Sequence, residues 1–474
     1  MTTKPFVFAG NELLLNFATS APGFVRVEIQ DSEGKPIAGY SLDDSKGLIG
    51  NYIEHPAAWR HGTDVGSLAG RPVRLRFVMK DADLYSMRFW PAHKFPTANE
   101  LPVRKGLPDP FVMQDGSQVA SHEDWRRQRE YLKEMLAHYL YGRMPPRPKQ
   151  IEIEKISSGG IFDDDTVEEH YKLTITQNGK SLSFRMGLVR PAGRTRRPVI
   201  VKNCSVLFDP NALPQGHRGR PTAQRDRNGA RMAVERGYIL CKYIRTDIAA
   251  DEKNNRSTGV FPLYPEYDWA TIAAWAWAHQ LVVDALDSLG YADMSRIVAT
   301  GHSRGGKTAL CAGIYDERVA ITAPNSSGTG GTGSMRYFEP GQRPQTVSYL
   351  VGAFPYWFLE SFADFADKPD RLPFDAHFMK ALIAPRGLIN CHARQDYWAN
   401  PYGTELTYRA AQTVFDWLDA GDHQGIHWRQ GGHAQNEEDW EALLDFADRF
   451  FFGKKVDSCF DVLAYPDAEV PVLR

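Results

Sequence analysis

The chain has 474 residues, more than a single hydrophobic core usually supports, so two domains are expected. Its formal net charge of −2 provides no basic field of the kind that nucleic-acid-binding proteins use. No segment contains 18 consecutive apolar residues, which excludes a conventional membrane-spanning helix.

Residues 1–92 consist of short apolar runs separated by turn signals. Val25, Val27 and Ile29 alternate with polar residues, and the run RPVRLRFVMKD shows the same period of two. This pattern predicts a small N-terminal β-sandwich. A segment rich in Pro, Lys and Asn follows, so we expect a linker at 93–105 and a second domain at 106–474.

The most informative motif is Gly301-His302-Ser303-Arg304-Gly305. The strand-like run RIVAT precedes it and the helix-forming run KTALCAGIY follows it. A strand, G-x-S-x-G and a helix form the nucleophile elbow of α/β-hydrolases, which places a serine hydroxyl on a sharp turn above the sheet. The second domain is therefore predicted to be a three-layer α/β/α hydrolase with Ser303 as its nucleophile.

A serine nucleophile needs a histidine base, which in this fold follows it in the chain. The histidines downstream of Ser303 are His377, His392, His423, His427 and His433. His433 lies in RQGGHAQNEEDW, a Gly-Gly loop between the last core strand and a closing helix, from which it can reach the elbow. His423 and His427 are expected to decorate a loop and a strand, and His392 to be a core histidine.

The base in turn needs an acid that orients it. The run PRGLINCHARQDYWANP predicts a buried strand that ends in a polar loop, and Asp396 lies a few residues beyond that strand. Other carboxylates follow on a predicted helix and its exit, where charged side chains are usually solvated. These rivals are Glu405, Asp416, Asp419 and Asp422. We therefore predict Asp396 as the acid.

Several separated segments now carry a family resemblance. From Leu101 to Gly453 the chain resembles the glucuronoyl esterases, carbohydrate esterase family 15, through LPDPFVMQDGSQVASHEDW, YDWATIAAWAWAHQLVVDAL, GHSRGGK, RLPFDAHFMKALIAPRGLI, DYWANPYG and GGHAQNEEDW. Arg304 and Lys307 beside Ser303 make GHSRGGK far more specific than an elbow alone. The resemblance implies a serine hydrolase that cleaves esters of glucuronic acid, such as those joining glucuronoxylan to lignin alcohols.

The resemblance also implies roles for single residues. Ser303 matches the nucleophile and His433 the general base. Arg304 matches an arginine whose backbone N–H and guanidinium stabilise the oxyanion of the tetrahedral intermediate.

Three further residues match positions that bind the sugar. Lys307 matches a lysine that hydrogen-bonds ring hydroxyls, and Trp398 a tryptophan that lines the site. Glu339, in MRYFEPG, matches an acidic sugar-binding residue across a two-residue gap. Without the resemblance, these residues would be interpreted as a surface charge, a loop aromatic and a solvated acid.

The chain departs from the family pattern at two positions. Many members carry the triad acid in the loop after the strand that follows the elbow helix, where this chain has Ser326. The family's other arrangement places the acid after the next strand, which favours Asp396. His302 stands where other members have Cys, so we expect no disulfide at the elbow.

Two alternative functions stay open: an acetyl-type carbohydrate esterase with the same triad, and a catalytically silent, glycan-binding hydrolase fold. The N-terminal domain is either a carbohydrate-binding module or a structural sandwich; Tyr52, Trp59 and Trp90 are not regularly spaced, which favours the second. No cofactor is expected, and the five cysteines show no metal-binding spacing, so no metal is expected either.

The expected partner is glucuronoxylan or a small glucuronate ester, bound by a monomer that uses neither nucleic acid nor a membrane. The resemblance implies secretion or a periplasmic location. The first residues, MTTKPFVFAG, lack the charged and apolar regions of a signal peptide, so a cytoplasmic location stays open.

Overall fold

In the computed structural model of the chain, the described residues are 1–8, 10–90, 95–148, 150–209 and 220–471. The chain divides into two compact units, Met1–Phe95 and Pro96–Arg474, and the division lies inside the segment predicted as a linker. Residues just after the division are bonded within the second unit. The Arg104 N–H, for example, donates to the Asp370 carbonyl.

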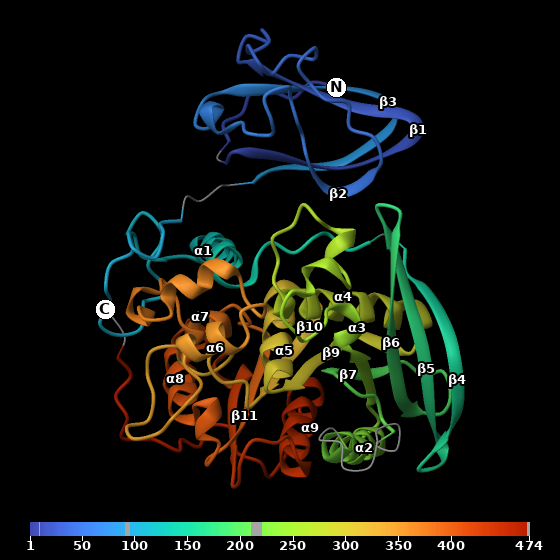
Figure 1. The fold of residues 1–474 in the computed structure, drawn as a ribbon, viewed down its shortest axis with the longest axis vertical. Coiled ribbons are helices and arrows are strands. Elements are labelled where there is room, and N and C mark those ends of the chain that lie inside the picture. Colours follow the sequence, from blue (N-terminus) through green and yellow to red (C-terminus); the bar gives the residue numbers. More distant parts are fainter. Residues whose placement is uncertain (9, 91–94, 149, 210–219, 472–474) are drawn as a thin grey trace. The chain divides into compact units, whose positions relative to one another are not determined.

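The described strands of the first unit form one antiparallel three-stranded sheet in the order β2-β1-β3 (Figure 1). These strands are β1 (Glu12–Asp31), β2 (Asn51–Pro56) and β3 (Val73–Trp90). The predicted β-sandwich is not confirmed. Val27 pairs with Phe77 and Ile29 with Leu75, so the two alternating runs are adjacent, hydrogen-bonded strands of a single sheet. Alternation shows which residues share a face but not how strands are distributed between sheets.

The second unit is built on a nine-stranded mixed sheet in the order β12-β11-β10-β9-β7-β8-β6-β5-β4. The strands from β7 to β12 run parallel, and β4, β5 and β6 form an antiparallel extension. The strand bounds are β4 (Glu152–Ile161), β5 (Asp163–Gln177), β6 (Lys180–Pro191), β7 (Arg197–Cys204), β8 (Ile239–Ile244), β9 (Ala292–His302), β10 (Val319–Asn325), β11 (Gly387–Ala393) and β12 (Gln424–Arg429).

Helices cover both faces of this sheet, with α2 and α9 packed together on one face and α4 and α5 on the other (Figure 1). The helices are α1 (His122–Leu136), α2 (Arg220–Glu235), α3 (Arg245–Ile248), α4 (Thr271–Leu289), α5 (Arg304–Tyr315), α6 (Val347–Ala353), α7 (Ala376–Ala381), α8 (Pro401–Trp417) and α9 (Glu437–Phe452). Shorter helical turns are η1 (Gly66–Leu68), η2 (Ala137–Tyr141), η4 (Asn255–Ser257), η5 (Phe261–Leu263), η6 (Glu360–Phe365), η7 (Pro369–Arg371), η8 (Tyr397–Ala399) and η9 (Gly421–His423). The second unit is thus an α/β fold.

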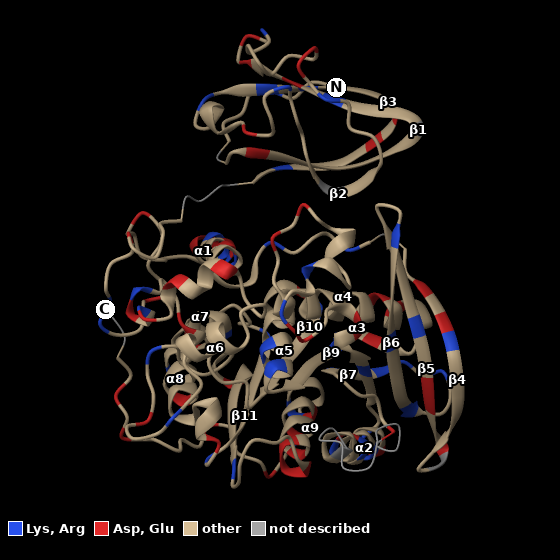
Figure 2. Cartoon of the chain, in the orientation of Figure 1, with Lys and Arg blue, Asp and Glu red and all other residues tan. Residues whose placement is uncertain are grey.

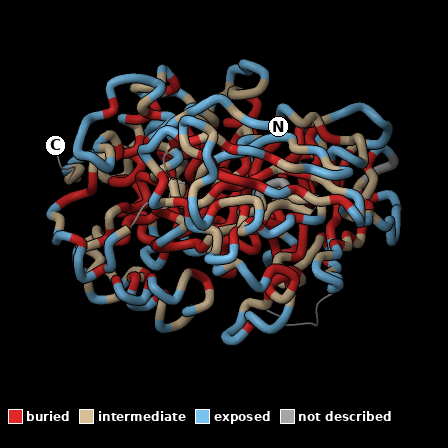
Figure 3. The backbone as a smooth tube through the Cα atoms, turned by 90° about the horizontal axis from the view of Figure 1, so that it is seen from above, coloured by how far each residue is buried: buried red, intermediate tan, exposed pale blue. Residues whose placement is uncertain are grey.

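Strands β8 and β11 are buried along their whole length, and β7 in all but its first residue, as expected of strands covered on both faces. Figure 3 colours the buried residues red. Helix α4 is also buried almost all round, which explains its long apolar sequence. None of the described helices is both long and apolar enough to cross a membrane. Basic and acidic residues are interspersed along the described elements (Figure 2).

This topology brings the candidate residues to one edge of the sheet. Ser303 follows β9, Ser326 follows β10, and Asp396 and His433 lie in the loops after β11 and β12. Because these four strands are parallel neighbours, their carboxyl ends meet at the same edge, which is where ligands bind in open α/β sheets.

Candidate active site

Ser303 stands on a strained turn between β9 and α5. Its φ of 58° and ψ of −121° lie in a region that residues other than glycine seldom adopt. A Cβ on Gly301 would collide with the Gly305 carbonyl oxygen, and a Cβ on Gly305 would lie 2.8 Å from Asn203 Oδ1. The two motif glycines therefore allow β7, β9 and α5 to approach closely enough to form the elbow.

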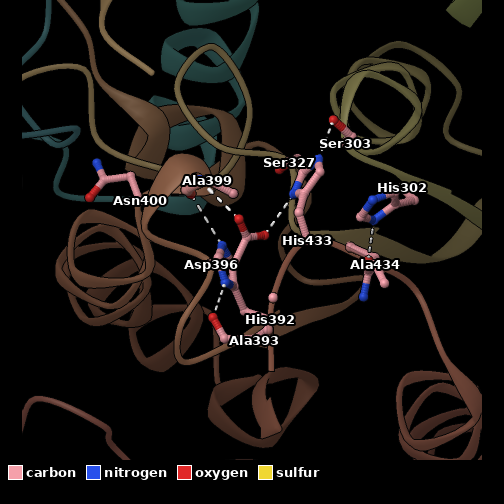
Figure 4. Close-up of polar contacts among 12 residues, drawn as sticks. His302, Ser303, Ser327, His392, Ala393, Asp396, Ala399, Asn400, His433 and Ala434 are labelled. Carbon is pink, nitrogen blue, oxygen red and sulfur yellow. Dashed lines mark hydrogen bonds and ion pairs between the residues drawn. The ribbon is translucent and has the colours of Figure 1, made fainter. Parts of the chain in front are cut away.

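Ser303, His433 and Asp396 form a continuous hydrogen-bonded chain (Figure 4). His433 Nδ1 lies 2.7 Å from Asp396 Oδ2, and His433 Nε2 lies 2.8 Å from Ser303 Oγ. A carboxylate can only accept, so Nδ1 carries the proton and Nε2 accepts from the serine hydroxyl. This is the tautomer that a histidine needs to remove a proton from serine.

The Asp396 carboxylate is almost completely buried, with 1% of its side chain exposed. Burial alone would raise the pKa of Asp396, but the hydrogen bond and charge of His433 outweigh it, and the pKa lies below its ordinary value. Asp396 also accepts from the Ala399 N–H, as the N-cap of η8. The carboxylate therefore stays ionised and is fixed in orientation.

Ser326, the position that carries the acid in many family members by resemblance, directly follows β10. Its hydroxyl contributes to the lowered pKa of Asp396, although its geometry falls short of a full hydrogen bond. Its φ of 41° places it in the left-handed region, and its N–H donates to the Cys391 carbonyl. The two candidate acid positions therefore follow neighbouring parallel strands, β10 and β11.

The loop that carries His433 is held by Arg429 at the end of β12. The Arg429 guanidinium donates to the Gly432 carbonyl at 3.1 Å and to the Ala434 carbonyl, the two residues that flank His433. Its Nε donates to Asp439 Oδ2 at 2.7 Å, and Asp439 forms a capping box with Asn436 at the start of α9. One buried arginine therefore ties the loop to the last helix.

A second anchor reaches the same loop from the sheet. Lys202 on β7 donates to Gln435 Oε1 at 2.6 Å and also to Asp226 on α2. Lys242 on β8 donates to the other Asp226 oxygen at 2.6 Å. All three charged groups are buried, and burial lowers the pKa of Lys202. The two lysines and one carboxylate form a cluster behind the His433 loop.

Arg304 begins α5, directly after Ser303. Its backbone N–H lies in the first helical turn, where amides lack intrahelical acceptors and the helix dipole favours negative charge. Its guanidinium donates to Asp251 Oδ2 at 2.5 Å and lies over the rings of Phe354 and Trp357. The arginine is therefore held in a defined position beside the serine.

Lys307 is buried, contrary to its interpretation as a surface charge in the absence of the family resemblance. Its Nζ donates to the Ser327 carbonyl and, at 3.0 Å, to Gln345 Oε1. The Gln345 N–H donates to the Trp398 carbonyl at 3.0 Å, so Gln345 connects Lys307 to Trp398. Burial, with a smaller contribution from the charge of Arg304, lowers the pKa of Lys307 to about 7.

The Trp398 indole is 37% exposed and packs edge-on against Tyr349, which is 44% exposed, at 4.6 Å between ring centroids. These rings offer an aromatic surface next to the buried Lys307 and Gln345. Glu339 accepts a hydrogen bond from the Tyr465 hydroxyl at 3.2 Å. No contact of Glu339 with Ser303 or Lys307 is found among the described residues, so its sugar-binding role stays a prediction.

Three of the other histidines downstream of Ser303 make hydrogen bonds to backbone carbonyls away from it. His392 is buried with its ring nitrogens against the Ala393 and Ala399 carbonyls, and His377 bonds the Pro108 carbonyl. His423 bonds the Pro385 carbonyl. In the described part of the chain, no cluster of three His, Cys, Asp or Glu residues is placed to hold a metal ion.

Sequence reasoning missed Asp251 and Gln345. Both lie outside the motifs, in a loop after α3 and in the segment before α6, and no local spacing signals their approach to Arg304 and Lys307. A buried lysine needs polar partners, but the burial of Lys307 is itself known only from the folded chain.

Comparison with known proteins finds several esterases that are similar to this chain. The model of a family described as glucuronyl esterase, fungi, matches residues 173–419, slightly more than half of the chain. A carbohydrate esterase, MZ0003, from an unknown prokaryotic organism is 27% identical over 394 residues, covering 73% of this chain and 90% of its own length. A 4-O-methyl-glucuronoyl methylesterase from Phanerochaete chrysosporium is 29% identical over 364 residues, covering 74% and 71%.

Solved structures show the same similarity. A family 15 glucuronoyl esterase from Caldicellulosiruptor kristjansonii superposes with a TM-score of 0.65 at 29% identity. The match covers 79% of this chain and 97% of that one. The similarity therefore extends over most of the second unit rather than over the elbow alone.

Proposed function

The chain belongs to the glucuronoyl esterase family and is a carboxylic ester hydrolase, and from that premise we propose that it cleaves esters of glucuronic acid through Ser303, His433 and Asp396. The linkages between 4-O-methyl-glucuronic acid side chains of xylan and lignin alcohols are the proposed natural targets. The observation that carries the proposal is the Ser303–His433–Asp396 chain beside the buried Lys307.

In the acylation step, Ser303 Oγ attacks the C6 carbonyl carbon of the ester while His433 Nε2 takes the hydroxyl proton. Asp396 holds the imidazole and stabilises the imidazolium that forms. The negative charge that develops on the carbonyl oxygen is met by the Arg304 backbone N–H and guanidinium. Donors aimed at such an oxygen are worth about 3 kcal/mol each. His433 then returns its proton to the departing alcohol, which leaves a glucuronoyl ester on Ser303.

In the deacylation step, a water molecule takes the place of the alcohol. His433 removes a proton from this water as it attacks the acyl carbon, and the same donors stabilise the second oxyanion. Ser303 leaves with the proton that His433 returns, and free glucuronate is released. The fixed Asp396 carboxylate supports both half-reactions.

The sugar ring is proposed to bind between Lys307 and Trp398. A protonated lysine has three N–H donors, and the Ser327 carbonyl and Gln345 account for two. The third is available to a ring hydroxyl. The partly exposed Trp398 indole offers an apolar face for the ring. This arrangement supports a polyhydroxylated acyl group rather than an acetyl group.

The direct test compares benzyl esters with the same leaving group. We expect kcat/KM for benzyl glucuronate to exceed that for benzyl acetate by at least ~10²-fold, because sites built around buried donors discriminate strongly against substrates that leave them unpaired. Equal values, with release of acetate from acetylated xylan, would favour the acetyl-esterase alternative. Binding of glucuronoxylan with no turnover of any ester would favour the silent glycan-binding alternative.

A further inference from the structure

The carboxylate of Asp251 makes hydrogen bonds to three side chains beside the elbow. Asp251 lies in the loop after α3, far from Ser303 in sequence. Its Oδ2 accepts from Arg304 at 2.5 Å, and its Oδ1 accepts from Trp357 Nε1 at 2.9 Å and from the Tyr356 hydroxyl at 3.0 Å. The Tyr356 hydroxyl also lies 2.8 Å from the Asp251 carbonyl. One carboxylate oxygen therefore binds Arg304, while the other is fixed by Trp357 and Tyr356.

The Arg304 guanidinium is constrained in two directions. The ion pair with Asp251 fixes one terminal nitrogen, and the rings of Phe354 and Trp357, which stack on each other at 3.9 Å, lie beneath its carbon at 5.1 and 4.6 Å. The Arg304 side chain remains 31% exposed. Without the ion pair, a long side chain with this exposure would sample several rotamers.

Asp251 also balances charge behind the elbow. Arg245 is partly buried. Burial lowers the pKa of its guanidinium; the charge of Asp251 opposes this shift and the charge of Arg304 adds to it. Burial would raise the pKa of Asp251, but the charge of Arg304 and the hydrogen bonds from Trp357 and Arg304 bring it below its ordinary value. The carboxylate is therefore ionised, and its charge offsets the repulsion between the Arg245 and Arg304 guanidinium groups.

We propose that Asp251 is the positioning residue for Arg304: it holds the guanidinium where the carbonyl oxygen of the ester becomes negative, and Tyr356 and Trp357 hold Asp251. This inference rests on the oxyanion role proposed for Arg304 above. Preorganised donors stabilise a transition state because they need not be reoriented during the reaction. Asp251 touches no reacting atom and acts only through Arg304.

A double-mutant cycle tests this dependence. In the wild-type background, Asp251→Asn should lower kcat roughly 10- to 100-fold with KM nearly unchanged, somewhat less than the loss typical of removing an oxyanion donor. In the Arg304→Ala background, the same Asp251→Asn change should alter kcat by less than ~2-fold, because the side chain through which Asp251 acts on the reaction is gone. An equal loss of kcat in both backgrounds would overturn the proposal, since a merely structural role does not depend on Arg304.

Two further variants serve as controls for misfolding and for the general loss of an ion pair. Tyr356→Phe keeps every charge and removes the hydroxyl that contacts the carboxylate and the carbonyl of Asp251, so it should lower kcat several-fold in the wild type and leave the kcat of Arg304→Ala unchanged. If Asp251→Asn does not fold, this second cycle decides the question in the same way. Asp247→Asn breaks the nearby Arg185–Asp247 ion pair and should leave kcat unaffected. A loss with Asp247→Asn equal to that with Asp251→Asn would also overturn the proposal.

The choice of substrate separates this inference from the proposed function. The cycle is run on both benzyl glucuronate and p-nitrophenyl acetate, because every acyl transfer at Ser303 develops the same oxyanion. If glucuronate esters were not substrates, coupling between Asp251 and Arg304 would still be measured with p-nitrophenyl acetate. If an ester is turned over but shows no coupling between Asp251 and Arg304, the positioning role of Asp251 is wrong, whereas the proposed esterase function is unaffected.

Discussion

The imidazole rings of His302 and His433 lie 4.5 Å apart between centroids, inclined at 48°. His302 Nδ1 also donates to Asn325 Oδ1 at 2.6 Å, so its ring is fixed between β10 and the His433 loop. By the family resemblance, other members carry cysteine at this position. His302 therefore supports the His433 loop through a non-covalent ring contact.

We predict that His302→Ala lowers kcat by up to ~10-fold with little change in KM, because packing of one ring on another contributes about 0.5–1.5 kcal/mol. Burial lowers the pKa of His302 to about 3, so its ring is neutral at ordinary pH and acts by packing, not by charge. His302→Phe keeps a ring and should recover part of the rate. Steady-state kinetics of the two variants at one pH measures this, and a Phe variant slower than the Ala variant would argue against packing as the cause.

The choice of acid can be tested between Asp396 and Ser326. Asp396→Asn removes the charge that orients His433, and we expect kcat to fall roughly 10²- to 10⁴-fold. Ser326→Ala removes only a hydroxyl that does not complete a hydrogen bond, so the rate should stay nearly unchanged. The two variants are compared by turnover of benzyl glucuronate. A larger loss of kcat for Ser326→Ala than for Asp396→Asn would show that Asp396 is not the acid.

Lys307→Ala and Arg304→Ala should differ in their kinetic signatures. Lys307 binds ring hydroxyls in the ground and transition states alike, so its loss should raise KM more than it lowers kcat. Arg304 meets charge that develops only in the transition state, so its loss should act mainly on kcat. Benzyl tetrahydropyran-2-carboxylate, a ring ester without hydroxyls, is the matched substrate. Arg304→Ala should slow both esters, whereas an equal effect of Lys307→Ala on both would show that the lysine is structural.

The lowered pKa of Lys307 predicts a pH-dependent KM. Below about pH 7 the amine is protonated and can donate a third hydrogen bond to the sugar. Above that pH it becomes neutral, and its two N–H groups are taken by the Ser327 carbonyl and Gln345. We therefore expect KM for benzyl glucuronate to rise roughly 10-fold as pH increases through 7, since a hydrogen bond to a charged group contributes about 1.5–3 kcal/mol. The KM of the Lys307→Met variant should not change over the same pH range. If KM rises in that variant as well, a group other than Lys307 causes the pH dependence.

Local patterns in the sequence were sufficient to predict the elbow and the α/β class of the second unit. A strand and a helix joined through two glycines around a serine are typical of the nucleophile elbow. The structure has the strained turn of that elbow, with a φ of 58° at Ser303. The first unit shows the limit of such reasoning. Residues such as Val27 and Phe77 alternate as in a sandwich, yet they are neighbours in one sheet, because pairing between strands is decided by contacts distant in sequence.

The environment of the charged residues was equally hidden from the sequence. Lys307 lies on the first turns of α5, where local pattern alone indicates a surface charge, but the segment from Ser326 to Gln345 folds over it. Only the family resemblance pointed to its role. Arg304 and Asp251 are likewise joined across 53 residues of sequence, a relationship that only the folded chain reveals.

The most direct measurement is the turnover of benzyl glucuronate by the wild type, Ser303→Ala and His433→Ala, with thermal unfolding as a control for folding. Nucleophile and base act as a unit, so each substitution should lower kcat by the order of 10⁶ while the melting temperature stays close to that of the wild type. Wild-type hydrolysis with loss of activity in both folded variants is the predicted result. Retention of more than about a thousandth of the wild-type rate by either folded variant would contradict the assignment of Ser303 and His433.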